Sequence, residues 1–236
     1  MPFNNLCLSS HQTTVPTAMI RAELIDHLGN DLTVANSARV SFNKESQFNP
    51  NGLLEERDVK LIAYLAKHHH FTPFTHPQIT LRETVPIFVA RQRFKHVVGF
   101  TYNEVSRRYV DEPPEFYHPQ EWRSRPEGSV KQGSGGAHNA SELFQSKYTV
   151  FLLKAKQLYS DMVAEGIAPE QARMVLPQSM LTSYYVTGSL AAFARAYKQR
   201  KDAHAQVEIQ DLASEWEKII APLYPVSWAA LTQGVY

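Results

Sequence analysis

Cationic and aromatic side chains alternate along residues 91–109 of a chain whose net charge is only +1. The cations are Arg91, Arg93, Lys95, Arg107 and Arg108, and the aromatic residues between and beside them are Phe94, Phe100, Tyr102 and Tyr109. Guanidinium groups bind phosphate oxygens bidentately, and polar side chains such as Gln92, Asn103 and Ser106 can contact the edges of a pyrimidine. This stretch is compatible with a mononucleotide site. A salt-bridged basic face and a surface for single-stranded nucleic acid are the alternatives.

A second polar cluster covers residues 195–208, where Arg200, His204 and Gln206 bracket a predicted helix start. The N-terminus of a helix favours an anion, although a capped and solvated helix end has the same residue types. Arg173 is interpreted as a surface arginine unless it points into a cleft.

Five of the ten histidines lie between His68 and His96, and His68, His69 and His70 are adjacent. Adjacent side chains point away from one another, and no HExxH or Cys/His framework is present in the sequence. We therefore expect a histidine-rich helix end and no metal site, and a zinc hydrolase is the least favoured function.

The 236 residues, 43% hydrophobic and 20% charged, predict one globular domain over residues 1–236. A single cysteine, Cys7, cannot form an internal disulfide, and we expect a cytoplasmic protein without a leader. No apolar run reaches the roughly 20 residues of a membrane span, so no membrane partner is expected. The near-zero net charge also counts against nucleic acid as a partner.

The apolar spacing predicts helices over residues 33–42 and 55–68, and a β-rich segment over 79–89 in which Pro86 indicates an edge strand, a bulge or a change into helix. Residues 123–138 are predicted to be a mobile loop.

The second half is predicted to be mostly helical. A long helix is expected over residues 142–165, with an apolar stripe and a C-terminal Gly166. A short helix is expected between Pro169 and Pro177, and a last helix is expected with Asp202 as its N-cap and with Ile209, Leu212, Trp216 and Ile219 facing inward.

Seven separated segments, taken together, resemble the flavin-dependent thymidylate synthases. The matching segments cover residues 29–42, 55–76, 86–96, 102–109, 115–117, 172–177 and 200–210. The family signature is an Arg-His-Arg triplet followed by Ser-x-Asn-Glu-x-Ser-x-Arg-Tyr, and this chain has Lys95-His96-Val97 and then residues 101–109. Lys95 and Val97 therefore depart from the signature, as does Ala191 in a later stretch where the family often has arginine. Arg93 or Arg107 is the candidate to compensate.

The resemblance implies an α+β fold with a core antiparallel sheet flanked by helices and a helical C-terminal half. It implies reductive methylation of deoxyuridylate (dUMP) to thymidylate (dTMP), with 5,10-methylenetetrahydrofolate as carbon donor and FAD, reduced by NADPH, as hydride source. It also implies a homotetramer with active sites between subunits. A nucleotide-binding relative that has lost synthase activity is the main alternative.

The resemblance also assigns residues to roles. Arg200 is the expected catalytic residue, where a permanent cation would stabilise negative charge on the uracil ring. Expected dUMP-binding residues are Gln92, Arg93, Lys95, Glu104, Ser106, Arg107, Arg108, Arg173 and Arg200. Expected flavin- or folate-binding residues are His70, Thr72, Lys95, His96, Val97, Glu104, Ser189, Arg195 and His204.

Overall fold

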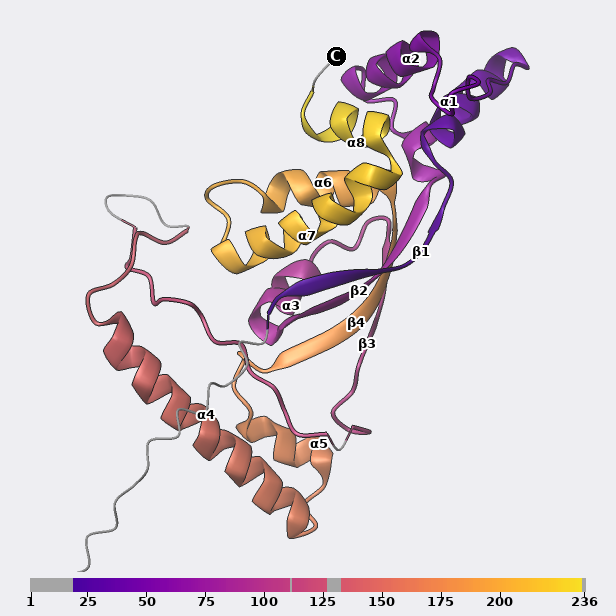
Figure 1. Ribbon diagram of the computed structural model, residues 1–236. Coiled ribbons are helices and arrows are strands. Elements are labelled where there is room, and N and C mark those ends of the chain that lie inside the picture. Colours follow the sequence, from indigo (N-terminus) through magenta and orange to yellow (C-terminus); the bar gives the residue numbers. More distant parts are fainter. Residues whose placement is uncertain (1–18, 111, 127–132, 235–236) are drawn as a thin grey trace, which may run out of the picture.

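Four antiparallel strands form one sheet at the centre of the computed structural model, which describes residues 19–110, 112–126 and 133–234 (Figure 1). The strands are β1 (Arg21–Leu28), β2 (Gln78–Pro86), β3 (Phe100–Glu104) and β4 (Leu181–Ser189), and their order is β1-β2-β4-β3. The two central strands pair along their full length, from Gln78 opposite Ser189 to Pro86 opposite Leu181. The predicted α+β fold with an antiparallel sheet is confirmed.

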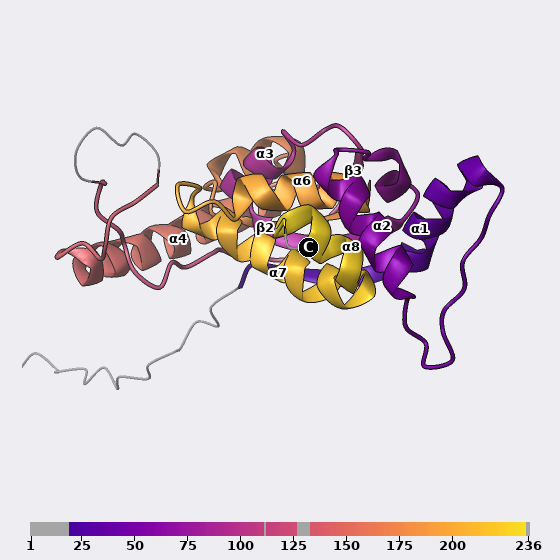
Figure 2. The same cartoon turned by 90° about the horizontal axis from the view of Figure 1, so that it is seen from above.

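Helices cover one face of this sheet and extend beyond its ends (Figures 1 and 2). The helices, including three 3-10 turns, are α1 (Asp31–Arg39), η1 (Val40–Phe42), α2 (Glu56–Lys67), η2 (Thr72–Thr75), α3 (Ile87–Arg93), α4 (Ser141–Ala164), α5 (Pro169–Ala172), η3 (Arg173–Val175), α6 (Leu190–Arg200), α7 (Val207–Leu223) and α8 (Pro225–Thr232). Helices α3, α6, α7 and α8 lie on the covered face, whereas α4 stands apart from them (Figure 1).

The core lies between the sheet and these helices. Trp216 of α7, Trp228 of α8 and Phe193 of α6 are among its largest fully buried side chains, and Tyr184 contributes from β4. Asp31 joins the two ends of the chain, because its carboxylate accepts hydrogen bonds from the backbone N–H groups of Val226 and Ser227 at the start of α8 (2.9 and 2.8 Å). That carboxylate satisfies N–H groups that a helix N-terminus otherwise leaves without partners.

Several predicted elements are confirmed. The helix predicted over residues 33–42 corresponds to α1 and η1, the one over 55–68 to α2, and the one over 142–165 to α4. Asn30 and Thr33 form a capping box at the start of α1, which explains where this helix begins. The short helix between Pro169 and Pro177 is present as α5 and η3.

Pro86 marks the change into helix, the last of the three alternatives. It is the last residue of β2 and the N-cap of α3, with extended backbone angles that suit both. The edge-strand alternative is wrong, because β2 lies between β1 and β4. A proline is tolerated here since it stands at the end of the ladder, where one missing N–H costs little.

Three features of the second half differ from the prediction. A central strand, β4, was not predicted, although the second half is mostly helical, as expected. Asp202 is not an N-cap, because α7 begins at Val207 with Gln206 in the cap position, while Asp202 accepts a hydrogen bond from the backbone N–H of His204 (2.8 Å). Helix α7 is not the last helix either, since α8 follows it.

Residues 123–138 have paired ends. Arg123 bridges to Ala137, and its guanidinium donates to Glu208 Oε1 (2.6 Å) and Ser134 Oγ (2.7 Å). The middle of the predicted loop, residues 127–132, lies outside the described part of the chain, so mobility there stays a prediction.

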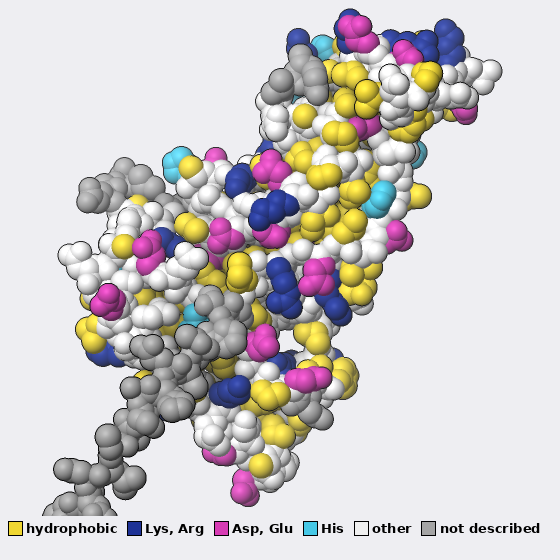
Figure 3. Space-filling model, in the orientation of Figure 1, with side chains coloured by type: hydrophobic (Ala, Val, Ile, Leu, Met, Phe, Trp, Pro, Cys, Tyr) yellow, Lys and Arg dark blue, Asp and Glu magenta, His cyan; other side chains and the backbone are white. Residues whose placement is uncertain are grey.

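Helix α4 exposes much of its apolar surface. Leu152, Ala155 and Tyr159 are buried, whereas other apolar side chains of the helix are about half exposed: Leu143, Phe144, Val150, Phe151, Leu153 and Leu158. The predicted stripe is thus only partly covered within one chain. Elsewhere, charged side chains of both signs are intermixed on the face shown in Figure 3. Within the described residues, no helix has the length and apolar character that a membrane crossing needs.

Candidate active site

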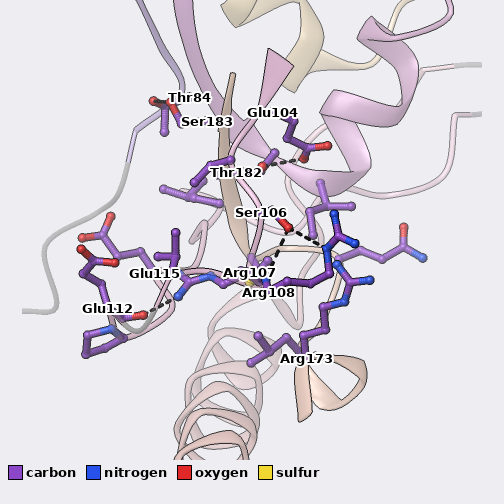
Figure 4. A pocket seen from close by; sticks show the side chains of 18 of the residues that line it. Thr84, Glu104, Ser106, Arg107, Arg108, Glu112, Glu115, Arg173, Thr182 and Ser183 are labelled. Atoms are coloured by element: carbon purple, nitrogen blue, oxygen red, sulfur yellow. Dashed lines mark hydrogen bonds between the residues drawn. The ribbon is translucent and has the colours of Figure 1, made fainter. Parts of the chain in front are cut away.

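A cleft of about 910 Å³ opens where β2 ends, where β4 begins and where the chain leaves β3. Five of the predicted nucleotide-binding residues line it, four from the segment at the end of β3 and the fifth from a distant part of the sequence (Figure 4). They are Glu104, Ser106, Arg107, Arg108 and Arg173. We call this the first cleft.

Arg108 and Arg173 direct their guanidinium groups to the same side of the first cleft (Figure 4). Arg108 Nε donates to Ser106 Oγ (3.2 Å), and Arg173 Nε donates to the carbonyl oxygen of Glu170 (3.2 Å). Within the described residues neither guanidinium forms a salt bridge. Two cations without a carboxylate partner repel one another, and a phosphate dianion between them removes that repulsion.

Arg107 points the other way, toward the carbonyl oxygen of Glu112 (Figure 4). It lines the first cleft from the opposite side and does not join Arg108 and Arg173.

The carboxylate of Glu104 is fixed at the end of β3. Thr182 of β4 is buried, and its hydroxyl donates to Glu104 Oε1 at 2.6 Å. The pairing of β3 with β4 places Glu104 opposite Tyr184, two residues beyond Thr182. The sheet therefore holds a hydrogen-bond acceptor in the first cleft together with the two cations.

Arg200 lies in a different cluster, at the C-terminal end of α6. Its Nε donates to His96 Nε2 (2.8 Å) and its Nη2 to the carbonyl oxygen of Gln92 (3.3 Å). The amide of Gln92 in turn donates to Gln206 Oε1 (2.6 Å). The predicted residues Gln92, His96 and Arg200 are thus brought together. The prediction that Arg200 lies at a helix start is wrong, because it is the last residue of α6.

His96 must be neutral to accept this hydrogen bond, since a protonated imidazole only donates. Burial, together with the positive charges of Arg200, Arg93 and Arg195, lowers the pKa of His96 to about 4. Burial and the charge of Arg93 also lower the pKa of Arg200 from its ordinary value. At neutral pH the pair therefore consists of a guanidinium donor and an uncharged imidazole acceptor.

The Arg200 cluster and the first cleft are separated within one chain. His96 precedes β3 and Ser106 follows it, and the strand from Phe100 to Glu104 alone spans about 13 Å. The first cleft has none of Gln92, His96 and Arg200 in its lining. One chain therefore contributes two parts of the predicted nucleotide site that do not face one another.

A second cleft of about 880 Å³ lies between the end of α2, helix α6 and helix α8. Arg195, a predicted flavin contact, lines it together with His69 and Phe71, the neighbours of the predicted contacts His70 and Thr72. Apolar walls and the cations Lys67, Arg195 and Lys198 surround the same space. Apolar walls can contact an aromatic ring and the cations can bind a diphosphate, so this cleft fits a molecule that combines the two, as FAD does.

The other predicted flavin contacts are dispersed. Lys95 and Val97 are exposed, and Glu104 belongs to the first cleft. The hydroxyl of Ser189 caps α6 by accepting a hydrogen bond from the backbone N–H of Ala192 (3.2 Å). His204 is exposed beside Asp202 in the connection from α6 to α7.

The prediction that Arg93 binds the nucleotide is wrong. Its side chain is 0% exposed and forms a salt bridge with Glu83, which is also 0% exposed (3.0 Å). The rings of Phe100 and Trp216 lie 4.3 and 4.7 Å from its guanidinium carbon. Arg93 therefore cannot compensate for the altered signature triplet at a ligand.

The histidine-rich segment ends a helix as predicted. Helix α2 stops at Lys67, His68 is its C-cap, and the ring of His68 packs against Tyr64 with 4.3 Å between centroids. In the described ranges, no three His, Cys, Asp or Glu side chains are grouped closely enough to hold a metal ion.

Sequence reasoning missed Thr182 and gave Gln206 no partner. Thr182 supports Glu104, and Gln206 supports Gln92 from the start of α7. No pattern in the residues around Thr182 indicates a contact with Glu104. That contact depends on the pairing of β4 with β3, and β4 was not predicted from the sequence. Gln206 stands two residues after His204 in a matching segment, but its contact spans 114 residues of chain.

The family model described as thymidylate synthase complementing protein (Thy1) matches residues 23–226 of this chain. A flavin-dependent thymidylate synthase of Thermotoga neapolitana is 35% identical over 214 residues, which is 91% of either chain. A protein of the same name from Tropheryma whipplei is 34% identical and covers 95% of both chains. The chain belongs to the Thy1 family, which includes these flavin-dependent thymidylate synthases.

A solved structure supports the same assignment. The UMP/dUMP methylase PolB from Streptomyces cacaoi, bound with 5-Br dUMP, superposes with a TM-score of 0.79 at 29% identity. The match covers 91% of this chain and 95% of that one. A second structure of PolB, bound with 5-Br UMP, matches with a TM-score of 0.78.

Proposed function

We propose that this protein is a flavin-dependent thymidylate synthase that converts dUMP to dTMP. The observation that carries the proposal is the first cleft, where Arg108 and Arg173 converge beside the fixed acceptor Glu104 and, among the described residues, have no carboxylate in a salt bridge with them. This set matches a nucleotide monophosphate, whose phosphate takes the two guanidinium groups and whose hydroxyl or imide N–H groups donate to the carboxylate.

Arg200 is the proposed catalytic residue. Its Nε and Nη2 are engaged by His96 and by the Gln92 carbonyl, while the described residues give its Nη1 no hydrogen-bond partner. A guanidinium held on two sides presents its remaining N–H groups to the uracil edge. Negative charge that develops on N3 and O2 is stabilised there, which makes the ring more reactive toward an electrophilic carbon.

FAD is the proposed cofactor, with Arg195, Lys67 and Lys198 in the second cleft as candidates to hold its diphosphate. The chemistry that the flavin supplies when bound is hydride donation after reduction by NADPH, and methylenetetrahydrofolate supplies the carbon. The chain itself provides binding, orientation and the cation at the uracil.

We propose that the enzyme is a homotetramer with active sites between subunits. The separation of Arg200 from the first cleft supports this assembly, because a second copy can bring one chain's Arg200 to another chain's Arg108 and Arg173. The half-exposed apolar face of α4 supports it as well, since contiguous apolar surface of this kind marks protein interfaces.

The first experiment is an anaerobic assay of the purified protein with FAD, NADPH, methylenetetrahydrofolate and dUMP, which follows dTMP and flavin absorbance together. We expect product and flavin reoxidation. A parallel assay with UMP tests the substrate, since the PolB structures contain analogues of both nucleotides. Bound dUMP without flavin or product would instead establish the degenerate relative.

The shared site has its own test. At dUMP concentrations well below saturation, Arg200→Ala and Arg108→Ala should each lose most of the activity alone, and the mixed, re-equilibrated variants should regain part of it, because a hybrid oligomer contains some sites with both arginines intact. Light scattering gives the mass of the assembly. A mass equal to one chain, or a mixture as inactive as its components, would contradict the shared site.

A further inference from the structure

Tyr102 connects the buried core to the turn that carries His96. It stands on β3 and is half-buried, and its hydroxyl has a partner on each side. The hydroxyl accepts a hydrogen bond from Arg93 Nη1 (2.6 Å) and donates one to the carbonyl oxygen of His96 (2.7 Å). A hydroxyl donates only one proton, and the carbonyl oxygen of Arg93, at 3.3 Å, is a more distant acceptor than that of His96, so the proton is directed to His96.

The inner end of this connection is rigid. Arg93 is clamped by the carboxylate of Glu83, which also accepts hydrogen bonds from Tyr184 Oη (2.6 Å) and Trp216 Nε1 (2.8 Å). Every one of these groups comes from a different element of the core: β2, α3, β4 and α7. The Tyr102 hydroxyl is therefore attached to a part of the protein that moves little.

The outer end is Arg200. The backbone of His96 is held by Tyr102, and the ring of the same residue accepts the Nε–H of Arg200. We propose that Tyr102 is a positioning residue, which fixes the His96 carbonyl and thereby holds the imidazole where it orients the guanidinium of Arg200. This inference rests on the proposed role of Arg200 in catalysis.

The charges around His96 favour this role. Arg200 and Arg195 face it from α6 and Arg93 from α3, while the Tyr102 hydroxyl approaches from β3. All three charged neighbours are cations, so they favour the neutral imidazole, which is the form that can accept from Arg200. Core stability alone does not require a buried ion pair, because apolar side chains replace one with little or no loss of stability. The contact that joins this ion pair to the His96 turn is therefore consistent with a role in positioning.

Tyr102→Phe and Tyr184→Phe form a matched pair. Each removes one hydroxyl from the same cluster, but only the Tyr102 hydroxyl contacts His96. We expect Tyr102→Phe to lower kcat/KM by about 10-fold or more, since a small misplacement of a catalytic group costs up to about 10²-fold. Tyr184→Phe should stay within about two-fold of the wild type. Equal losses in the two variants would overturn the positioning role.

A second readout does not depend on activity. In a histidine NMR titration from pH 8 to pH 5, with the His96 signal assigned by its absence in His96→Gln, the wild type and Tyr184→Phe should keep His96 neutral. In Tyr102→Phe the released ring should titrate within this range. An unchanged His96 signal in Tyr102→Phe would overturn the link, whereas failure of the wild type to make dTMP would overturn the proposed function alone.

Urea unfolding of both variants completes the test. Tyr102→Phe should lose no more stability than Tyr184→Phe, because Tyr102 is half-buried whereas Tyr184 is fully buried. If Tyr102→Phe alone failed to fold, the hydroxyl would belong to the folding core and the positioning role would be wrong.

Discussion

The buried pair of Glu83 and Arg93 provides the sharpest prediction for stability. Both side chains are 0% exposed, and the carboxylate of Glu83 accepts hydrogen bonds from Arg93, Tyr184 and Trp216. Glu83→Gln removes the negative charge, leaves the guanidinium buried without a counterion, and replaces one acceptor oxygen with an NH₂ group that faces other donors. Breaking a buried pair in this way costs about 3–5 kcal/mol, which is a large fraction of the 5–15 kcal/mol typical of a whole domain.

A surface pair in the same chain is the control. Lys60 Nζ lies 2.7 Å from Glu56 Oε1, closer than the 3.0 Å between Arg93 and Glu83, but its side chains are 73% and 82% exposed. Glu56→Gln should therefore leave the stability nearly unchanged, because water screens an exposed pair. The contrast tests whether burial, and not distance, decides the size of the effect.

The assay is urea unfolding followed by far-UV circular dichroism at one fixed protein concentration, since assembly makes stability concentration-dependent. A double-mutant cycle with Glu83→Met and Arg93→Met isolates the interaction. We expect a coupling energy above about 2 kcal/mol, because each single variant leaves one buried charge alone and the double variant leaves none. Glu83→Gln within about 1 kcal/mol of the wild type, or additive Met variants, would refute the reasoning.

Three further predictions concern the site and the ends of the chain. Arg108→Ala should weaken dUMP binding by about 10-fold or more without lowering the unfolding temperature, because a hydrogen bond to a charged group contributes about 1.5–3 kcal/mol; calorimetric titration measures this, and unchanged affinity would remove Arg108 from the phosphate site. Asp31→Ala should destabilise the protein by about 1–2 kcal/mol, because α8 loses the cap on its first N–H groups; thermal unfolding no different from the wild type would contradict this. Because His96 has a pKa of about 4 when folded, below the ordinary 6.5, the unfolded state binds more protons between these values, so stability should fall by about 2 kcal/mol from pH 7 to pH 5; an equal fall in His96→Gln would assign the loss to other groups.

Much of the local structure could be predicted from the sequence. Apolar spacing is a local property, and it located α2 and α4 to within about two residues. Pro169 indicated the start of α5, because a proline suits the first helical turn, and this preference is also a local property. The strand β4 was not predicted. It lies between β2 and β3 and owes its position to pairing with them, which apolar spacing along the chain does not show.

Local sequence patterns did not predict which arginines are buried and which line a cleft. Arg93 and Arg108 have the same chemistry and lie in the same basic stretch, yet one is fully buried against Glu83 and the other lines the first cleft. The difference arises because Arg93 ends α3 on the covered side of the sheet, whereas Arg108 follows β3 beyond its end. No periodicity in the sequence distinguishes these positions.

The sequence by itself determined the family, the inventory of cations and the positions of most helices, because motifs and apolar periods are written in neighbouring residues. Only the tertiary structure decided which of these cations lie in the first cleft, which lie in the Arg200 cluster and which are buried in the core. It brought Arg173 to Arg108 and Thr182 to Glu104, and it placed Arg200 against His96 at the other end of β3. These contacts join residues that are far apart in the chain. Strand pairing and helix packing bring such residues together, and neither can be derived from neighbouring residues alone.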